Sequence, residues 1–393
     1  MDKTVVTNYF QRFGFSERQI DEPPPEDLGI VVVVPCFDEP DLIGALESLR
    51  ACERPKFAVE VIAVVNSSAD ASKEAKARNR ASAEIALSYA HVIHVSDLPP
   101  KHAGVGLARK IGMDEALRRF ADVGRLWDGV ILNFDADCRC DANYLRAIEA
   151  HFAAHPRTPG CSIYFEHPPG PPDLYELHLR YYVQGLRYAG HPYAFHTIGS
   201  CMAVRAQVYM EQGGMNKRKA GEDFYFLQKV IALGNYTDLL TTRVIPSARE
   251  SDRVPFGTGK AVGEQLRGKP ALTYPFEAFE DLKAFFEDIE NPRDQVHKFL
   301  EPLGFEQKLR EIRDNTAGAD AFRNRFFRWF NGFAAMKYMH FARDHFYGPR
   351  AVSEEARRLP GFAGEKDLLK AYRDLQRRQI YRMNKGEFDD VEV

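Results

Sequence analysis

The stretch Gly129-Val-Ile-Leu-Asn-Phe134, followed at once by Asp135-Ala136-Asp137, decides the expected fold of this chain. The first six residues predict a buried strand, and two carboxylates spaced one residue apart come directly after it. In an open parallel sheet, ligands bind outside the carboxyl ends of the strands. Asp side chains at such an edge offer hard oxygen ligands to Mg²⁺ or Mn²⁺, with a phosphate completing the shell. An Asp after a strand is also a common turn former or helix cap, so the neighbouring segments must decide between these interpretations.

Strands and helices alternate upstream of that stretch. The run Ile30-Val-Val-Val-Val34 is too apolar for a sheet with one wet face and therefore predicts a central parallel strand. Further strands are predicted at 59–65 and 91–95, and helices from Pro40 onward, at 71–87 and at 105–121. This alternation indicates a parallel sheet with right-handed crossovers.

The alternation continues downstream and then stops. Strands are predicted at 160–166, in the segment 196–205 and at 236–245, and helices at 142–155, 174–188 and 221–229. From about Glu277 onward, strand signals vanish and charged amphipathic helix dominates. We therefore expect an α/β fold with a mostly parallel central sheet flanked by helices and a helical C-terminal appendage. The expected parts are an N-terminal arm at 1–28, an α/β domain at 29–270 and a helical region at 271–393.

The bulk composition excludes several classes of protein. Of the 393 residues, 45% are hydrophobic and 28% are charged, which is typical of a globular protein and not of a disordered one. The formal net charge of -3 argues against a protein that coats nucleic acid. No apolar run is long enough to cross a membrane and the start lacks a signal-peptide pattern, so a soluble cytoplasmic protein is expected. The six cysteines show neither Cys-x-x-Cys pairs nor zinc spacing, which favours reduced structural thiols.

Four stretches, in this order along the chain, resemble the family 2 glycosyltransferases, which are inverting enzymes with the Rossmann-like GT-A fold. The stretches are Val31 to Glu39 (Val-Val-Val-Val-Pro-Cys-Phe-Asp-Glu), the pattern Gly-x-x-x-Ala-Arg-Lys-x-Gly from Gly104 to Gly112, Asp135-Ala136-Asp137, and Gly213-Gly-Met215 leading to Glu222-Asp223. The resemblance covers about residues 29 to 245. It implies that the α/β domain binds a nucleotide diphosphate-sugar and transfers its sugar.

The resemblance also assigns roles to individual residues. It places Pro35, Phe37 and Glu39 in the turn that packs against the nucleotide base. It places Asp135, Ala136 and Asp137 at the Asp-x-Asp position, which contacts ribose and metal. Asp135 and Asp137 are therefore the metal candidates, with Asp137 as the expected direct ligand. The departing diphosphate gains negative charge, so a divalent cation, Mn²⁺ or Mg²⁺, is the expected cofactor.

In the same resemblance, Asp223 matches the carboxylate that serves as general base. An acceptor hydroxyl is a poor nucleophile until a positioned carboxylate takes its proton. Glu222 is a second catalytic candidate, or it only holds the loop. The plain structural interpretation of both residues is charge complementarity at the start of a helix.

Further candidates for donor binding follow from the resemblance and from the residues themselves. Asn66 stands where the family commonly has an Asp that reads the base, which leaves the nucleotide open. Arg109 and its neighbour Lys110 are candidates for contact with the nucleotide phosphates, although cations on a helix often face solvent. Arg249 and Arg253 ride on the segment 246–260, here called the arginine loop, which is not a phosphate-binding P-loop. This loop either closes over the diphosphate or is a solvated surface turn.

The leading hypothesis is thus metal-dependent transfer of a single sugar, with inversion, from a nucleotide diphosphate-sugar to a saccharide or other hydroxyl acceptor. A sugar-phosphate nucleotidyltransferase and a catalytically silent binding module that acts through its C-terminal helices are the alternatives. The aromatic and basic segment Phe322 to Phe330 fits contact with a membrane surface, with a second copy of the chain or with the catalytic domain.

Overall fold

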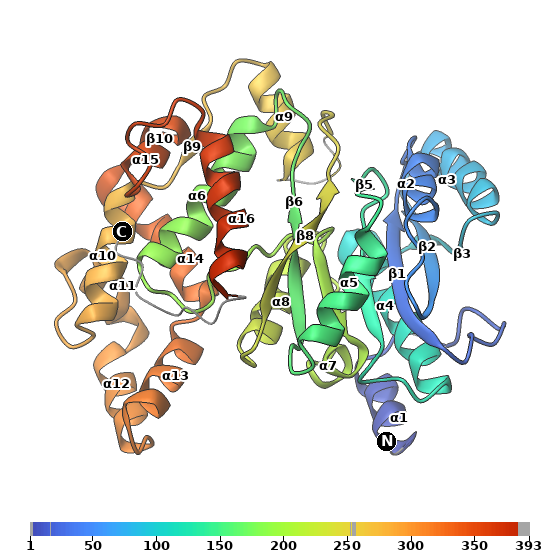
Figure 1. Ribbon diagram of the computed structural model, residues 1–393, viewed down its shortest axis with the longest axis horizontal. Coiled ribbons are helices and arrows are strands. Elements are labelled where there is room, and N and C mark those ends of the chain that lie inside the picture. Colours follow the sequence, from blue (N-terminus) through green and yellow to red (C-terminus); the bar gives the residue numbers. More distant parts are fainter. Residues whose placement is uncertain (1–2, 16, 252, 254–256, 384–393) are drawn as a thin grey trace. The chain divides into compact units, whose positions relative to one another are not determined.

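The computed structural model describes residues 3–15, 17–251, 253 and 257–383. The chain separates into two compact units that interleave along the sequence (Figure 1). Unit 1 consists of Met1–Pro168 and Thr197–Gly259, and unit 2 consists of Pro169–His196 and Lys260–Val393. The division into three parts expected at 1–28, 29–270 and 271–393 remains a prediction. Asp252 and residues 254–256 of the arginine loop lie outside the described residues.

An eight-stranded sheet forms the centre of unit 1, in the order β3-β2-β1-β4-β7-β6-β8-β5. Its strands are β1 (Leu28–Cys36), β2 (Ala58–Ser68), β3 (His91–Leu98), β4 (Val130–Asn133), β5 (Arg139–Cys140), β6 (Gly160–Phe165), β7 (Met202–Arg205) and β8 (Thr237–Ile245). The four strands from β3 to β4 are parallel, and β6 is parallel to β8. Strand β7 runs antiparallel to both neighbours, and β5 runs antiparallel to β8. The mostly parallel sheet predicted from the sequence is confirmed.

Strand β1 lies at the centre because both of its faces are apolar. Every residue from Leu28 to Cys36 is buried, as the continuous valine run predicts for a strand covered on both sides. Val33 of β1 pairs with Asn133 of β4, and the backbone N–H of Phe134 donates to the carbonyl of Val33 at 3.0 Å. The turns that follow β1 and β4 therefore leave the sheet at the same edge.

The helices of unit 1 are α1 (Lys3–Arg12), α2 (Leu42–Arg50), α3 (Lys73–Ala86), α4 (Val105–Asp122), α5 (Tyr144–Ala154), α7 (Ala206–Glu211) and α8 (Glu222–Ile231). Helix α4 packs on β1 and β2. Gly112 permits this close approach, because a Cβ atom there would lie 2.4 Å from Val33 Cγ1 and 2.9 Å from Val64 Cγ2. The predicted helices at 71–87, 105–121, 142–155 and 221–229 are present within a few residues of their expected bounds.

Helix α1 belongs to the segment that was expected to be an arm, and it docks on α4. Tyr9 is buried and its hydroxyl donates to Asp114 Oδ1 at 2.6 Å. The backbone N–H of Phe15 donates to Asp114 Oδ2, also at 2.6 Å. A tyrosine can bury its apolar ring with little penalty when its hydroxyl group has a hydrogen-bond partner. Tyr9 therefore anchors α1 to α4.

Unit 2 is almost entirely helical, which confirms the predicted helical C-terminal region. Its elements are α6 (Asp173–Tyr188), α9 (Thr258–Leu266, which begins in unit 1), α10 (Phe276–Glu287), α11 (Asp294–Leu300), the 3-10 helix η1 (Glu301–Leu303), α12 (Phe305–Asp314), α13 (Ala319–Trp329), α14 (Gly332–Ala342), the π-helix η2 (Arg343–Tyr347), α15 (Val352–Arg358), α16 (Leu368–Met383) and the short antiparallel pair β9 (Leu272–Thr273) and β10 (Arg350–Ala351).

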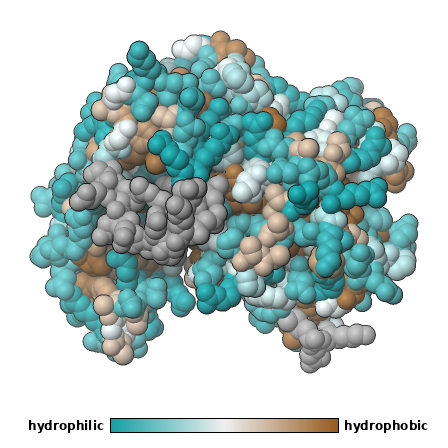
Figure 2. All heavy atoms as spheres, in the orientation of Figure 1, coloured by the Kyte–Doolittle hydropathy of each residue, from teal (hydrophilic) through white to brown (hydrophobic). Residues whose placement is uncertain are grey.

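An aromatic core holds unit 2 together. Phe279, Phe285, Phe326, Phe330 and Tyr338 are fully buried in it. The apolar side of the predicted aromatic helix near 322–330 thus packs within unit 2, and contact with a membrane or a second copy stays a prediction. Hydrophilic residues predominate on the face that Figure 2 shows. Among the helices of the described ranges, none combines the length and the apolar character needed to cross a bilayer.

Candidate functional site

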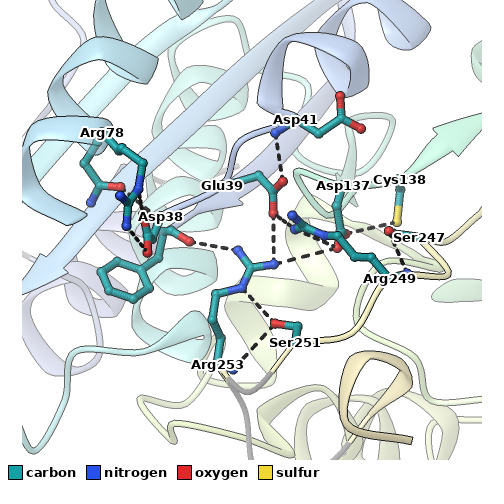
Figure 3. A network of polar contacts seen from close by, with 12 residues as sticks. Asp38, Glu39, Asp41, Arg78, Asp137, Cys138, Ser247, Arg249, Ser251 and Arg253 are labelled. Atoms are coloured by element: carbon teal, nitrogen blue, oxygen red, sulfur yellow. Dashed lines mark hydrogen bonds and ion pairs between the residues drawn. The ribbon is translucent and has the colours of Figure 1, made fainter. Parts of the chain in front are cut away.

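Glu39 and Asp137 face one another at the edge where β1 and β4 end, and two arginines of the arginine loop lie between them (Figure 3). Arg249 Nη2 contacts Glu39 Oε2 and lies 3.4 Å from Asp137 Oδ2. Arg253 Nη2 lies 2.9 Å from Glu39 Oε2 and 3.8 Å from Asp137 Oδ2. The structure therefore brings together four predicted site residues from three segments that are far apart in the sequence.

The arginine loop is also tied to the turn after β1. Arg253 Nη1 donates to the backbone carbonyl of Phe37 at 2.9 Å, and its Nε donates to Ser251 Oγ at 3.1 Å. Phe37 is 36% exposed, so its ring is available at the surface of the turn. Pro35, two residues earlier, is a buried residue of β1. The turn that carries this exposed aromatic ring is thus bonded to the arginine loop through its backbone.

Asp38 adopts a left-handed backbone conformation, which two residues of α3 stabilise. Its φ is +50°, a region in which Asp is tolerated better than most residues. Its carboxylate accepts from Arg78, with Nη2 at 2.9 Å from Oδ2, and its N–H donates to Asn79 Oδ1 at 2.8 Å. Asn79 Nδ2 in turn donates to the backbone carbonyl of Asn66 at 3.1 Å. Asn66 is buried at the same sheet edge. Through this bond to Asn79, its backbone helps to support the turn.

Sequence reasoning missed Arg78 and Asn79. The one available signal was Asn79 itself, since an Asn in the middle of a helix is unfavourable unless its side chain has a specific partner. Nothing in the sequence marked Arg78 as the partner of Asp38.

A second cluster centres on Arg109. This side chain is 5% exposed, with Nη2 at 2.6 Å from Asp135 Oδ1 and Nη1 bonded to Glu222 Oε1. Gly199 makes room for the guanidinium, because a Cβ at that position would lie 2.3 Å from Nη1. Arg109 thereby joins the acidic segment after β4 to the start of α8. Lys110, one residue later, points elsewhere and pairs with Asp114 at 3.0 Å.

Asp223 follows Glu222 at the start of α8 and is half-buried. Its carboxylate accepts a hydrogen bond from the backbone N–H of Phe224 at 2.7 Å. Burial and the adjacent charge of Glu222 raise the pKa of Asp223 to about 6, against partial compensation by Arg109. The negative charge of Asp135 contributes to the same rise. Asp135 and Asp223 are thus close enough to interact.

The surroundings of Asp137 leave its negative charge incompletely compensated. Burial raises the pKa of Asp137, and Asp135 and Glu39 raise it further, while Arg249 and Arg253 act in the opposite direction. Such a site favours an additional cation, and carboxylate oxygens suit Mg²⁺ or Mn²⁺. Within the described ranges, no three His, Cys, Asp or Glu side chains converge as ligands. Asp137 therefore fits a divalent cation only if oxygen atoms of another molecule complete the shell. Ala136, between the two acids, is buried and offers no polar side-chain group.

Comparison with known families finds one match. The family described as "Glycosyl transferase family 2" matches residues 31–213. This range includes Glu39, Arg109, Asp135 and Asp137, and it ends before Asp223 and the arginine loop. No curated protein matches the chain.

Several solved structures are similar over most of the chain at low identity. TarS 1–349 of S. aureus in complex with UDP-GlcNAc is 15% identical, with a TM-score of 0.42 over 92% of this chain and 93% of that chain. The same protein in complex with UDP gives 13% identity and a TM-score of 0.41, over 93% and 95% of the two chains. The mannosyltransferase PcManGT of Pyrobaculum calidifontis, in complex with GDP-Man and Mn²⁺, gives 14% and 0.40, over 99% and 96%. At these scores the likenesses assign neither a donor nor an acceptor to this chain.

Proposed function

We propose, from the premise that residues 31–213 are a family 2 glycosyltransferase domain, that this chain transfers a single sugar from a nucleotide diphosphate-sugar to an acceptor hydroxyl and inverts the anomeric centre. The observation that carries the proposal is the Arg109 bridge. It supports a shared site because it holds the Asp135 segment, on the expected donor side, against the segment that contains Asp223.

The donor diphosphate is proposed to bind at the arginine loop. Guanidinium groups bind phosphate oxygens with paired, charge-assisted hydrogen bonds. Arg249 Nε is buried and has no hydrogen-bond partner in the part of the chain that the structure describes, so this donor is free for a phosphate oxygen. The exposed ring of Phe37, with Pro35 and Asn66 beneath the turn, is the proposed contact for the base. Arg249 and Arg253 would turn from Glu39 and Asp137 towards the diphosphate as the loop closes.

A divalent cation, Mn²⁺ or Mg²⁺, is the proposed cofactor. Asp137 would hold it, with Asp135 contributing from the other end of the Asp-x-Asp segment. When bound, such a cation supplies Lewis-acid neutralisation of the charge that develops on the leaving diphosphate. Glu39 is bonded to the arginines, so its proposed role is to position them.

Asp223 is the proposed general base. Its pKa of about 6 leaves the carboxylate ionised at neutral pH, yet basic enough to take a proton from a hydroxyl as the bond to the sugar forms. The proton of the acceptor hydroxyl passes to the Asp223 carboxylate while the nucleoside diphosphate leaves. Attack from the side opposite the leaving group produces inversion. Glu222 is fully buried and paired with Arg109, so we assign it a positioning role and not proton transfer.

Thermal-shift measurements test the donor class. The chain is melted with UDP-, GDP- and other nucleotide sugars, each with and without Mn²⁺. A ligand that binds only the folded state, at about 100 times its Kd, adds about 2.7 kcal/mol to the free energy of unfolding. A stabilisation that requires both nucleotide sugar and Mn²⁺ is expected.

Product analysis separates this proposal from its two alternatives. Nuclear magnetic resonance of the product should show the anomeric configuration opposite to that of the donor. Release of pyrophosphate from a nucleoside triphosphate would instead identify a sugar-phosphate nucleotidyltransferase. Full biological activity of the Asp223→Asn variant would identify a silent binding module.

A further inference from the structure

Three consecutive cations lie just before the proposed base and have no role in the mechanism above. Lys217, Arg218 and Lys219, here called the basic loop, are all exposed. None of them forms an ion pair with any residue of the described ranges, whereas Arg109, Arg249 and Arg253 are all paired with carboxylates. In a chain with a formal net charge of -3, this is a local excess of uncompensated positive charge.

The structure holds the basic loop in a defined position. Asn216 Nδ2 donates to the backbone carbonyl of Glu222 at 3.0 Å, and Asn216 Oδ1 accepts from the backbone N–H of Arg218 at 3.1 Å. The guanidinium of Arg218 lies over the ring of Tyr225, 4.0 Å from its centroid. These contacts fix the loop against the first turn of α8, which carries Asp223.

Gly106 in α4 and Gly104, directly before this helix, let the basic loop pack closely against α4. A Cβ at Gly106 would lie 2.2 Å from the carbonyl oxygen of Arg218, and a Cβ at Gly104 would lie 3.0 Å from Lys219 Cα. Arg109 belongs to the same first turns of α4. The basic loop is thus confined between the two helices that supply Arg109 and Asp223.

Holding these cations together is electrostatically unfavourable unless an anion joins them. Burial lowers the pKa of Lys110 against the opposing effect of its partner Asp114, and the nearby charge of Lys217 adds to the lowering. The loop itself contains no acidic residue between Met215 and Gly221. Around Asp137, by contrast, Arg249 and Arg253 are paired with carboxylates, so these two arginines of the proposed donor side leave no such unpaired positive charge. The basic loop therefore offers a second position for an anion, separate from the one proposed for the donor diphosphate.

We propose that the basic loop binds a phosphate group of the acceptor, so that the acceptor is a phosphate-bearing molecule with its reacting hydroxyl close to that phosphate. Lys supplies a point charge and Arg a paired hydrogen-bonding fork, and both are suited to phosphate oxygens. This inference rests on the proposed function in one respect, namely that Asp223 marks the position of the reacting hydroxyl. The phosphate can belong to a soluble molecule or to a lipid head group.

Direct binding of two probes tests the proposal and distinguishes these sources. The first probe is end-labelled inorganic polyphosphate, followed by fluorescence anisotropy. The second is vesicles of equimolar phosphatidylcholine and phosphatidylglycerol, compared with phosphatidylcholine alone by co-sedimentation. Both titrations are run on the full chain, with and without a saturating nucleoside diphosphate and Mn²⁺, so that probe bound at the donor site is displaced and excluded.

The variant Lys217→Gln/Lys219→Gln is compared with Lys73→Gln/Arg80→Gln, which removes two exposed cations from α3 that also lack ion pairs in the described residues. Probe affinity should fall by roughly tenfold or more in the first variant and change by less than about twofold in the second. The dependence of log affinity on log salt should become shallower by about one for each cation removed from the loop. Binding of polyphosphate but not of the anionic vesicles indicates a soluble acceptor, and binding of the anionic vesicles indicates a lipid-linked one.

Three results would overturn the assignment. The first is equal loss of probe affinity in both double variants, and the second is unchanged affinity in Lys217→Gln/Arg218→Gln/Lys219→Gln. The third is a fall in nucleoside diphosphate affinity as large as the fall in probe affinity, which would give the loop to the donor. Failure of every nucleotide sugar to stabilise the chain would contradict the proposed donor class instead, and the probe titrations would still decide the role of the basic loop.

Discussion

Arg109 and Glu222, 113 positions apart in the sequence, form an ion pair in which neither side chain is more than 5% exposed. The same guanidinium reaches Asp135 at 2.6 Å. A buried charge of this kind is tolerated only when its partners are present. The acidic segment after β4 and the start of α8 are therefore held together by one side chain.

Replacement of Arg109 by Gln should destabilise the fold by about 3–5 kcal/mol, because it leaves Glu222 buried without its partner. The free energy of unfolding is measured by urea titration. Arg18→Gln is the matched control, since it removes an ion pair with Asp122 in which both side chains are more than a third exposed, and should cost less than about 1 kcal/mol. Equal losses in the two variants would mean that the buried pair contributes no more than a surface one.

Asp223→Asn should lower kcat by about 10²- to 10⁴-fold without destabilising the fold, because the amide cannot accept the proton of the acceptor. Turnover is followed as release of nucleoside diphosphate. Glu222→Gln serves as the contrasting variant and should lower the free energy of unfolding, since Glu222 is the buried partner of Arg109. Wild-type turnover in Asp223→Asn would remove Asp223 from the mechanism.

The activity of the wild-type chain should fall as the pH drops through about 6, where Asp223 takes up a proton. Arg109 lowers the pKa of Asp223, so the midpoint for any active Arg109→Gln enzyme should move to higher pH. The profile of kcat/KM against pH gives the midpoint for the wild-type chain and for the variant. A midpoint that is the same in the two proteins would show that Arg109 does not tune the base.

Stability should depend on pH through the same carboxyl. Its pKa is raised from 3.8 to about 6 in the folded chain, so between these values the folded state retains a proton that the unfolded state has released. The free energy of unfolding contributed by Asp223 therefore falls as pH rises from about 4 to about 6 and is constant above. Relative to wild type, Asp223→Asn should gain at most about 2–3 kcal/mol across this window. Urea titrations at a series of pH values check this, and parallel curves for the two proteins would contradict it.

Arg249→Ala/Arg253→Ala should weaken donor binding by roughly tenfold or more, because two charge-assisted contacts with the diphosphate are lost. Nucleoside diphosphate affinity is measured by calorimetric titration in the presence of Mn²⁺. The exposed arginines 54 and 80, neither of which has an ion-pair partner in the described residues, provide the control double variant. Unchanged affinity in Arg249→Ala/Arg253→Ala would leave the arginine loop as a surface turn.

Removal of divalent cations by a chelator should abolish turnover, and Mn²⁺ or Mg²⁺ should restore it. Asp137→Asn should lose the part of the nucleotide-sugar thermal shift that depends on Mn²⁺, because it removes the proposed direct ligand. Glu84→Gln, at an exposed position on α3, should keep that shift. A Mn²⁺-dependent shift of wild-type size in Asp137→Asn would place the cation elsewhere.

The sheet was predictable because its strands carry local signals. The valine run of β1 indicates a buried strand, and the acidic stretch after β4 indicates where that strand ends, each within a few adjacent residues. The parallel sheet then places the ends of both strands at one edge. Lys110 and Arg109 show the limit of such reasoning. Both are cations on one helix, and only the packing of α4 reveals that one pairs with Asp114 and the other with Asp135 and Glu222.

The other features that the sequence did not predict also arise from contacts between residues that are distant in sequence. Asn79 supports Asp38 across 41 positions, and the two-residue strand β5 exists only through its pairing with β8. Tyr9 gave no signal of its own, because its burial depends on Asp114, 105 residues later. The donor role predicted for Arg109 stays a prediction, and its observed partners are the two carboxylates.

The interleaving of the two units constrains how the protein can be dissected. Helix α6 leaves unit 1 after β6, and its Leu177, Tyr181 and Leu186 are buried in the aromatic core of unit 2. Truncation near residue 270 would strip these side chains of that core and expose them to water, which favours aggregation. An isolated catalytic fragment would therefore require excision of 169–196 as well, with a short linker joining β6 to the segment before β7.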